Sequence, residues 1–275
     1  MRVAQRFGVA QVERRLYCLE MCPELGRLTV NYANTLQNLD KSLKSRVYVP
    51  CTPWDPPPSF YKILKKAAYK LGEQMGPKLD ADGLHEVLAR FPPRKRELYT
   101  EGLATPLDLK QHAKISTFIK CENVPMKEAD KPRVIQFRDP VFLAHLLECM
   151  KPLEHAFYHG RYLFNRHQKI TCAKGLNVLE RMRCLERMVD SLEDPHVVGL
   201  DGSAFDAHVS QGALKAEWLF YEKSWRAAGY SSQDIEKMRR MGREQLVNRC
   251  RAKADDGVLK YKVKGNRMSG DLTTG

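Results

Sequence analysis

Apolar and polar positions recur along this chain with two different periods, and each period predicts an element. Apolar residues three or four apart are typical of amphipathic helices, and strict alternation is typical of half-buried strands. The helical spacing occurs over 59–71, 175–192 and 213–221, and we expect the second of these helices to pack in the core. Alternation predicts strands over 115–120, 131–138 and 260–264.

A third pattern is a short apolar run that ends on a carboxylate, Val197-Val198-Gly199-Leu200-Asp201. It predicts a buried strand that presents Asp201 at its C-terminal end, where chemistry commonly lies in mixed α/β proteins. Asp206 follows in the turn before the next predicted helix, so that both carboxylates can face one cavity. Two aspartates five residues apart are frequent by chance, but in this context a metal ion is the natural partner for Asp201.

Two further segments offer groups that suit a nucleotide. Alternation over 131–138 places Arg133 and Ile135 on one face, so that Arg133 or Lys131 can meet a triphosphate while Ile135 packs under a base. An ordinary exposed hairpin with solvated charges is the alternative for this segment. Near the end of the chain, the Ser269-Gly270 loop can offer a hydroxyl and close backbone approach to a sugar or phosphate, with a plain helix N-cap as the alternative.

The overall positive charge indicates a polyanionic binding partner. The 275 residues carry a formal net charge of +13, which favours nucleic acid because lysine and arginine release counterions when they neutralise phosphates. The eight cysteines form no paired C-x-x-C sets, so that we expect reduced thiols in an intracellular protein. No apolar stretch approaches the length of about 18 residues that a membrane span needs, and we expect no transmembrane segment in this chain.

Three segments, in their order along the chain, resemble motifs of the RNA-dependent RNA polymerases of positive-strand RNA viruses, and most closely those of the tombusvirus-like group. The resemblance to motif A lies in Asp201-Gly202-Ser203-Ala204-Phe205-Asp206-Ala207-His208-Val209. The segment Ser269-Gly270-Asp271-Leu272-Thr273-Thr274 resembles the start of motif B. The segment Lys131-Pro132-Arg133-Val134-Ile135-Gln136 resembles the end of motif F, and Lys114 and Lys120 would belong to the first strand of that motif.

The resemblance implies template-directed RNA synthesis with two Mg²⁺ ions, for which Mn²⁺ can substitute. It implies that Asp201 binds these metals together with the carbonyl of Gly202, and that Asp206 helps to recognise the ribose 2′-hydroxyl, which distinguishes RNA from DNA. The nucleotide would be bound by the other motif residues, which are Lys114, Lys120, Lys131, Arg133, Ile135, Ser269, Gly270, Thr273 and Thr274.

The implied architecture is an α+β right-hand polymerase fold, of which we expect this chain to hold the fingers and part of the palm. No Gly-Asp-Asp sequence, the family's motif C, occurs in the chain. We therefore expect an inactive fragment that lacks the thumb and motif C. Thr273 also stands where the tombusvirus-like group often has Asn. The expected division is fingers over 1–195, a palm segment with motif A over 196–222, a fingers return over 223–264 and the start of palm motif B over 265–275.

The implied partners are an RNA template, the nascent strand, nucleoside triphosphates and other viral replication proteins. The implied location is the host cell cytoplasm, where attachment to membranes would come from other regions or proteins. Two other classes stay open on the sequence alone. A non-catalytic RNA-binding or replication-accessory module would need only the basic charge, and a metal-dependent phosphohydrolase would use Asp201 and Asp206 without a template.

Overall fold

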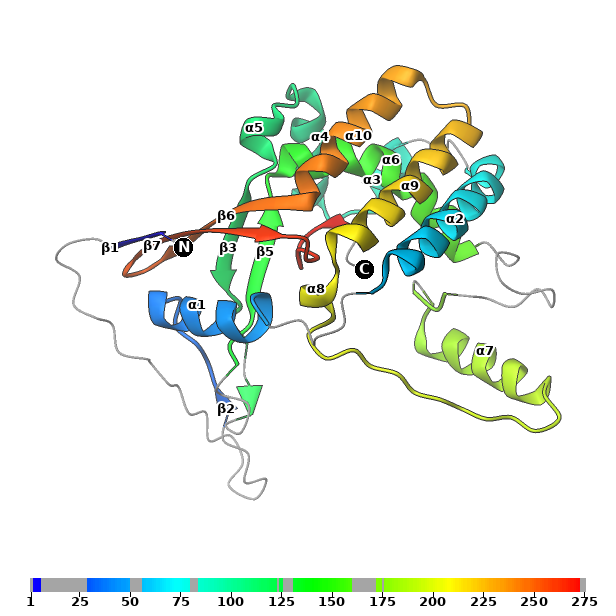
Figure 1. Ribbon diagram of the computed structural model, residues 1–275, viewed down its shortest axis with the longest axis horizontal. Helices are drawn as coiled ribbons and strands as arrows, with labels where there is room; N and C mark the ends of the chain where they lie inside the picture. Colours follow the sequence, from blue (N-terminus) through cyan, green and yellow to red (C-terminus); the bar gives the residue numbers. More distant parts are fainter. Residues whose placement is uncertain are drawn as a thin grey trace.

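The structure, a computed structural model, describes residues 2–5, 29–49, 56–79, 84–122, 124–125, 131–159, 172–174 and 176–272. A mixed sheet lies beside a layer of helices (Figure 1). The helices are α1 (Leu36–Ser42), the π-helix η2 (Leu43–Val47), α2 (Pro58–Met75), the 3₁₀ turn η3 (Gly76–Lys78), α3 (Leu84–Ala89), α4 (Pro93–Ala104), α5 (Leu109–His112), α6 (Pro140–His159), α7 (Val178–Asp190), α8 (Phe205–His208), α9 (Gln211–Ala227) and α10 (Ser232–Leu246).

The main sheet has the strand order β1-β7-β6-β3-β5. Neighbouring strands are antiparallel except for β3 and β6, which run parallel. A separate pairing joins the two short strands β2 and β4. The strands are β1 (Arg2–Gln5), β2 (Thr29–Val30), β3 (Ile115–Ile119), β4 (Val124–Pro125), β5 (Val134–Arg138), β6 (Val247–Ala254) and β7 (Gly257–Lys264).

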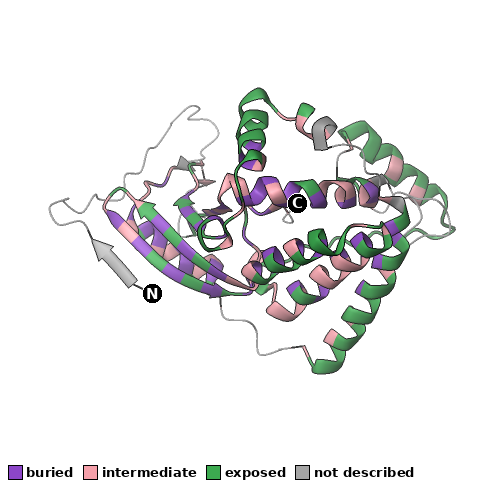
Figure 2. Ribbon diagram, turned by 90° about the horizontal axis from the view of Figure 1, so that it is seen from above, coloured by how far each residue is buried: buried purple, intermediate pink, exposed green. Residues whose placement is uncertain are grey.

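Buried and exposed residues alternate along β3, β6 and β7, so that one face of the sheet forms a core and the other faces solvent. Figure 2 shows this alternation along the strands. The buried face packs against α1 and η2 through Leu39, Leu43 and Val47. Because side chains on opposite faces of a strand alternate with a period of two, this packing fixes the faces of the whole sheet.

A second core lies between the helices. Phe142 and Leu146 of α6 are fully buried against Trp225 of α9 and Met241 of α10. The helical layer is also joined to the sheet through the chain itself, since α10 runs directly into β6. No helix in the described part of the chain has the length and apolar character needed to cross a membrane.

Most of the predicted elements are confirmed. The helices predicted over 59–71 and 213–221 form within α2 and α9, which extend a few residues further at both ends. The three predicted strands are β3, β5 and β7. A helix also forms within 175–192 as α7, begun by a capping box in which Asn177 and Glu180 each accept a hydrogen bond from the other's backbone N–H.

The prediction that this 175–192 helix packs in the core is wrong. Leu179, Met182 and Leu185 of α7 are 62%, 51% and 60% exposed, and no residue of the helix is buried. Figure 1 shows α7 set apart from the sheet and the other helices. The spacing of its apolar residues specified a helix with one apolar side, but spacing does not specify which surface covers that side.

The buried strand predicted before Asp201 is also wrong for this structure. Residues 195–202 form no strand, and Val197, Val198 and Leu200 are 85%, 77% and 93% exposed. A strand needs a neighbour to receive its backbone hydrogen bonds, and this run is paired with no strand in the described part of the chain. An apolar run of this kind becomes a buried strand only where a neighbouring strand pairs with it.

Candidate active site

The hairpin of β3 and β5 gathers the cations of the predicted triphosphate site. Phe118 pairs with Ile135 across the two strands, and the N–H of Lys120 donates to the carbonyl of Arg133 at 2.8 Å. Directly paired residues share a face, so that Lys120, Arg133 and Ile135 lie on the same side of the hairpin. The predicted alternation of β5 is confirmed, because Val134, Gln136 and Arg138 are buried on the other side. Lys114 is exposed just before β3.

Glu122 binds two of these cations, and sequence analysis missed it. Its Oε2 lies 2.6 Å from Nζ of Lys120 and 3.3 Å from Nη1 of Arg133. Its other oxygen, Oε1, is buried and accepts no hydrogen bond from the described residues. The available signal was the spacing: Glu122 is two residues after Lys120, at the same phase of the alternation.

The Ser269-Gly270 loop is attached to the middle of β5. The N–H of Gln136 donates to Oγ of Ser269 at 3.0 Å, and the N–H of Gly270 donates to the carbonyl of Gln136 at 2.7 Å. A Cβ on residue 270 would lie 2.8 Å from that carbonyl oxygen and 2.7 Å from Cβ of Phe137. The close approach of the two backbones therefore requires glycine at this position.

A buried ion pair strengthens the same attachment. Nε of Arg138 donates to Oδ1 of Asp271 at 2.8 Å, and both side chains are almost completely buried. The other guanidinium nitrogens donate to the carbonyl of Ala113 at 2.6 Å and to Oδ1 of Asn248 at 2.5 Å. Arg138 thus joins the start of β3, the start of β6 and the Ser269-Gly270 loop in one hydrogen-bonded group. Sequence analysis placed Arg138 on the face opposite Arg133 but gave it no role.

Asp206 lies beside this loop in the one-turn helix α8. The N–H of Arg267 donates to the carbonyl of Asp206, and the N–H of Asn266 donates to that of Val209, both at 2.8 Å. The side chain of Arg267 forms an ion pair with Glu217 of α9. Partial burial raises the pKa of the Asp206 carboxyl, and the positive charges of Arg267 and Arg133 oppose that rise. Asp206 is therefore within electrostatic range of the predicted triphosphate site.

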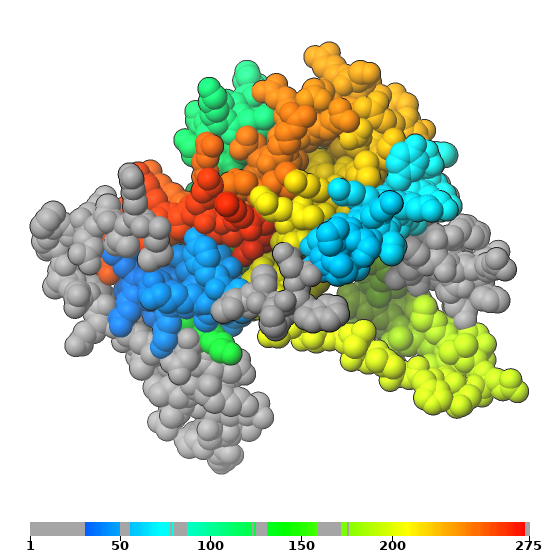
Figure 3. Space-filling view, in the orientation of Figure 1, coloured from blue at the N-terminus to red at the C-terminus, as the bar shows by residue number. Residues whose placement is uncertain are grey.

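The space-filling view shows the same juxtaposition from outside. The red C-terminal segment, the yellow region of α8 and the blue region of α1 and η2 meet on one face (Figure 3). Nδ2 of Asn266 donates to the carbonyl of Val47 at 2.8 Å, which fixes the turn against η2. Gly265 and Asn266 both have positive φ, 74° and 61°, so that the chain reverses direction between β7 and the Ser269-Gly270 loop.

The predicted metal ligands, unlike the Ser269-Gly270 loop, are not held by hydrogen bonds to the sheet within the described ranges. Asp201 and Gly202 are exposed and belong to no helix or strand. The described residues contain no group of three or more His, Cys, Asp or Glu that could hold a metal ion. Thr273 and Thr274 lie outside the described residues. The structure thus brings Arg133, Asp206 and the Ser269-Gly270 loop together, and among the described residues no hydrogen bond or ion pair joins Asp201 to them.

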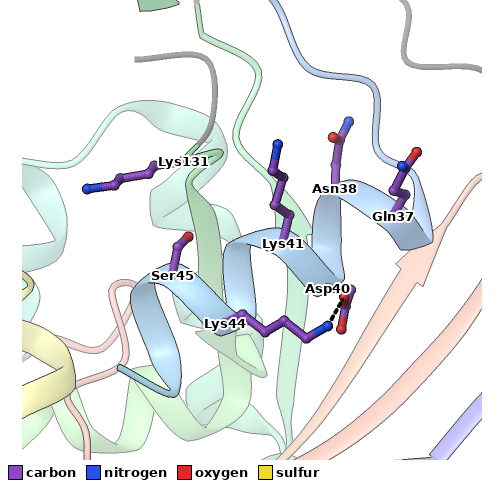
Figure 4. A pocket seen from close by; sticks show the side chains of 7 residues that line it. All are labelled: Gln37, Asn38, Asp40, Lys41, Lys44, Ser45 and Lys131. Carbon is purple, nitrogen blue, oxygen red and sulfur yellow. Dashed lines mark hydrogen bonds and ion pairs between the residues drawn. The ribbon is translucent and has the colours of Figure 1, made fainter. Parts of the chain in front are cut away.

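Lys131, the remaining predicted nucleotide contact, faces a separate cavity. This cavity of about 560 Å³ lies over α1 and is open to solvent (Figure 4). Nζ of Lys44 is paired there with Oδ2 of Asp40 at 2.6 Å, and Arg46 donates to the carbonyl of Lys131. The lining residues are Gln37, Asn38, Asp40, Lys41, Lys44, Ser45 and Lys131.

The fold and these motif contacts define a class of protein, and the comparison with known families agrees with it. Residues 1–275 match the family described as viral RNA dependent RNA polymerase, and the chain belongs to this family. Membership implies the right-hand polymerase fold, with which the mixed α and β structure is compatible.

The individual relatives are RNA-directed RNA polymerases of plant viruses. The chain is 34% identical to that of groundnut rosette virus over 252 residues, which are 88% of the chain and 28% of the relative. It is 36% identical to that of maize chlorotic mottle virus over 194 residues, 67% of the chain and 19% of the relative. The match to the oat chlorotic stunt virus enzyme has 28% identity and covers 100% of the chain and 38% of the relative. The chain therefore spans well under half the length of these relatives.

Proposed function

We propose that this chain provides the nucleotide-binding part of the active site of a viral RNA-directed RNA polymerase. The observation that carries the proposal is the set of bonds that joins three motifs into one unit. The Ser269-Gly270 loop is bonded to Gln136 in β5, and the segment before that loop is bonded through Arg267 to Asp206. A nucleotide needs contacts to its phosphates, base and ribose at once, and the three motifs together offer all three kinds of contact.

The side chains present suit these contacts. Lys120 and Arg133 are held by a single carboxylate, and a triphosphate carries enough negative charge to replace it. Ile135 lies beside Arg133 and can pack under the base. Oγ of Ser269 accepts a hydrogen bond from Gln136, so that its own proton is available to a ribose oxygen. The Asp206 carboxylate can accept a hydrogen bond from the 2′-hydroxyl.

Asp201 is the proposed ligand of Mg²⁺. Magnesium in nucleotide-processing sites is commonly bound by one or two carboxylates together with substrate phosphates and waters. The exposed carboxylate of Asp201 and the adjacent carbonyl of Gly202 fit this preference for oxygen. When bound, two such ions stabilise the attacking and leaving oxygens of nucleotidyl transfer, and Mn²⁺ can take their place.

The division of the chain into fingers over 1–195 and 223–264 and palm over 196–222 and 265–275 forms part of the same proposal. So do the partners, which are an RNA template, a nascent strand, nucleoside triphosphates and other replication proteins in the host cell cytoplasm. The proposal is supported by the family match and by the enzyme name that the relatives share.

The test is primer extension on an RNA template by the complete polymerase that contains these residues. Asp201→Asn should abolish extension, because losing a metal ligand removes several kcal/mol of transition-state stabilisation, which is at least about a hundredfold in rate. Asp190→Asn is the matched control, since Asp190 is also an exposed aspartate and lies at the end of α7. Asp206→Asn should reduce the preference for ribonucleotides over deoxyribonucleotides.

Other outcomes separate the competing classes. Nucleotide hydrolysis that needs no template and is lost in Asp201→Asn would indicate a phosphohydrolase. RNA binding without any extension by the complete protein would indicate an accessory module. Equal extension by Asp201→Asn and Asp190→Asn would remove Asp201 from the active site.

A further inference from the structure

The exposed face of the β6–β7 hairpin carries a concentrated positive charge. Every exposed position within the two strands is lysine or arginine. We call these six residues the basic ribbon; they are Arg249, Arg251, Lys253, Lys260, Lys262 and Lys264.

The register brings like charges directly opposite each other. Arg249 pairs with Lys262, and Arg251 pairs with Lys260. Like charges at such positions destabilise a sheet. None of the six side chains forms an ion pair with another residue in the described ranges. The sequence therefore keeps an arrangement that costs stability and that an external anion would relieve.

Protection of a sheet edge does not account for this charge. Lysines on an edge strand discourage pairing with other chains, but β6 lies between β7 and β3 and has no free edge over its paired residues. Arg251, which lies in the part of β6 that is paired on both sides, thus needs another explanation.

The same face continues into the predicted triphosphate site. Arg251 pairs with Ser116 in β3, and Ser116 pairs with Phe137 in β5. Phe118, which is 41% exposed, lies on this face with its ring centroid 5.8 Å from that of Phe137. Arg133 follows at the end of the face. The same face of the sheet therefore runs from the basic ribbon across Ser116 and Phe118 to Arg133.

We propose that the basic ribbon binds the phosphate backbone of single-stranded RNA and guides it past β3 toward the nucleotide site. This inference rests on the proposed polymerase function, because it assigns the strand that the active site copies or extends. Alternate residues of a strand are about 6.7 Å apart and neighbouring strands about 4.8 Å apart, so that the cations form a regular two-row array. Phe118 can stack on an unpaired base beside that array, which favours single-stranded RNA over duplex.

The experiment measures RNA binding by residues 1–275 without nucleotides. Fluorescence anisotropy with an unstructured 20-nucleotide RNA is recorded over a range of salt concentrations. The ribbon variant is Arg249→Gln, Arg251→Gln, Lys260→Gln and Lys262→Gln. The matched control is Lys62→Gln, Lys65→Gln, Lys66→Gln and Lys70→Gln on α2, four exposed lysines whose loss changes the net charge by the same amount.

The ribbon variant should bind at least about tenfold more weakly at moderate salt. The slope of log K against log salt should fall by about 3, since each phosphate contact to a single strand contributes about 0.7. The control should change the slope by less than about 1. Equal losses in the two variants would overturn the inference, and so would unchanged binding by the ribbon variant, which would leave an acidic protein surface as the partner.

Folding is checked by the melting temperature, which should not fall because the variant removes opposed like charges. If it does fall, the double variant Arg251→Gln and Lys260→Gln decides the question, with an expected slope change of about 1.4. Failure of the polymerase proposal gives a different result. Primer extension by the complete protein would then be insensitive to Asp201→Asn, while the difference between the ribbon and control variants in RNA binding would persist.

Discussion

The segment from Val178 to Gly202 carries a predicted catalytic residue and the segment from Asn266 to Asp271 carries predicted nucleotide-binding residues, yet the two are held in opposite ways. The second is bonded to β5, to α8 and to η2 and ends on a buried ion pair. The first exposes the apolar side of α7 and the apolar run before Asp201. The difference indicates that the nucleotide-binding contacts are organised within this chain, whereas the exposed Asp201 forms no hydrogen bond or ion pair with the described residues.

The largest expected effect is a difference in the free energy of unfolding between variants that affect the two segments. Arg138→Ala should lower the free energy of unfolding by about 3–5 kcal/mol, because it leaves the Asp271 carboxylate buried without its partner. Arg187→Ala, in the exposed helix α7, should change it by no more than about 0.5 kcal/mol. Urea unfolding followed by circular dichroism measures both.

A second variant tests whether the charge of this pair is what matters. Replacing both partners, as Arg138→Met with Asp271→Leu, should recover much of the loss, since apolar residues of similar volume often replace a buried ion pair without cost. If Arg138→Ala and Arg187→Ala are equally stable, the buried pair does not hold the Ser269-Gly270 loop and the contrast between the segments fails.

A smaller effect is expected from one added methyl group in each segment. Gly270→Ala should cost about 1–3 kcal/mol, because its Cβ would overlap Gln136 and Phe137 in a packed site. Gly199→Ala is the matched control, since a Cβ there meets no atom within 4 Å. The comparison is made by thermal unfolding, and in the complete polymerase Gly270→Ala should also raise KM for nucleotides more than Gly199→Ala does. A Gly270→Ala protein as stable as Gly199→Ala would mean that the loop can move away from β5.

Sequence analysis predicted local features well and long-range contacts poorly, and the reason is physical. The alternation in β3, β5 and β7 is a property of a few consecutive residues, so that the faces of Arg133 and Ile135 followed directly from it. The parallel pairing of β3 with β6, and the group formed by Arg138 with Asp271, depend on residues far apart in the chain. One signal was present: Arg138 follows Val134 and Gln136 on the face that the structure buries, and a cation on a buried face implies a buried partner.

The two wrong predictions have a common origin. An apolar side on α7 and an apolar run before Asp201 were both taken as evidence of burial. A sequence pattern specifies only which side of an element is apolar. The surface that covers this side must be provided by another segment. The proposed roles of Asp201, Gly202, Thr273 and Thr274 rest on the motifs.

The smallest expected effect concerns Asp206. Its charged carboxylate suits the proposed recognition of the ribose, but burying that charge lowers the free energy of unfolding at neutral pH. Partial burial raises the pKa of its carboxyl above the unfolded value, so that the folded state binds a proton more tightly than the unfolded state does. This group therefore favours folding at a pH below its unfolded pKa, and that contribution is lost as the pH rises through the folded pKa. Asp206→Asn should accordingly be slightly more stable than the wild type at pH 7 and indistinguishable from it near pH 3. Chemical unfolding at the two pH values measures the difference. A lower stability of Asp206→Asn at pH 7 would mean that the attraction of Arg267 and Arg133 outweighs the cost of burial, and that the carboxylate is held ready for its ligand by those two cations.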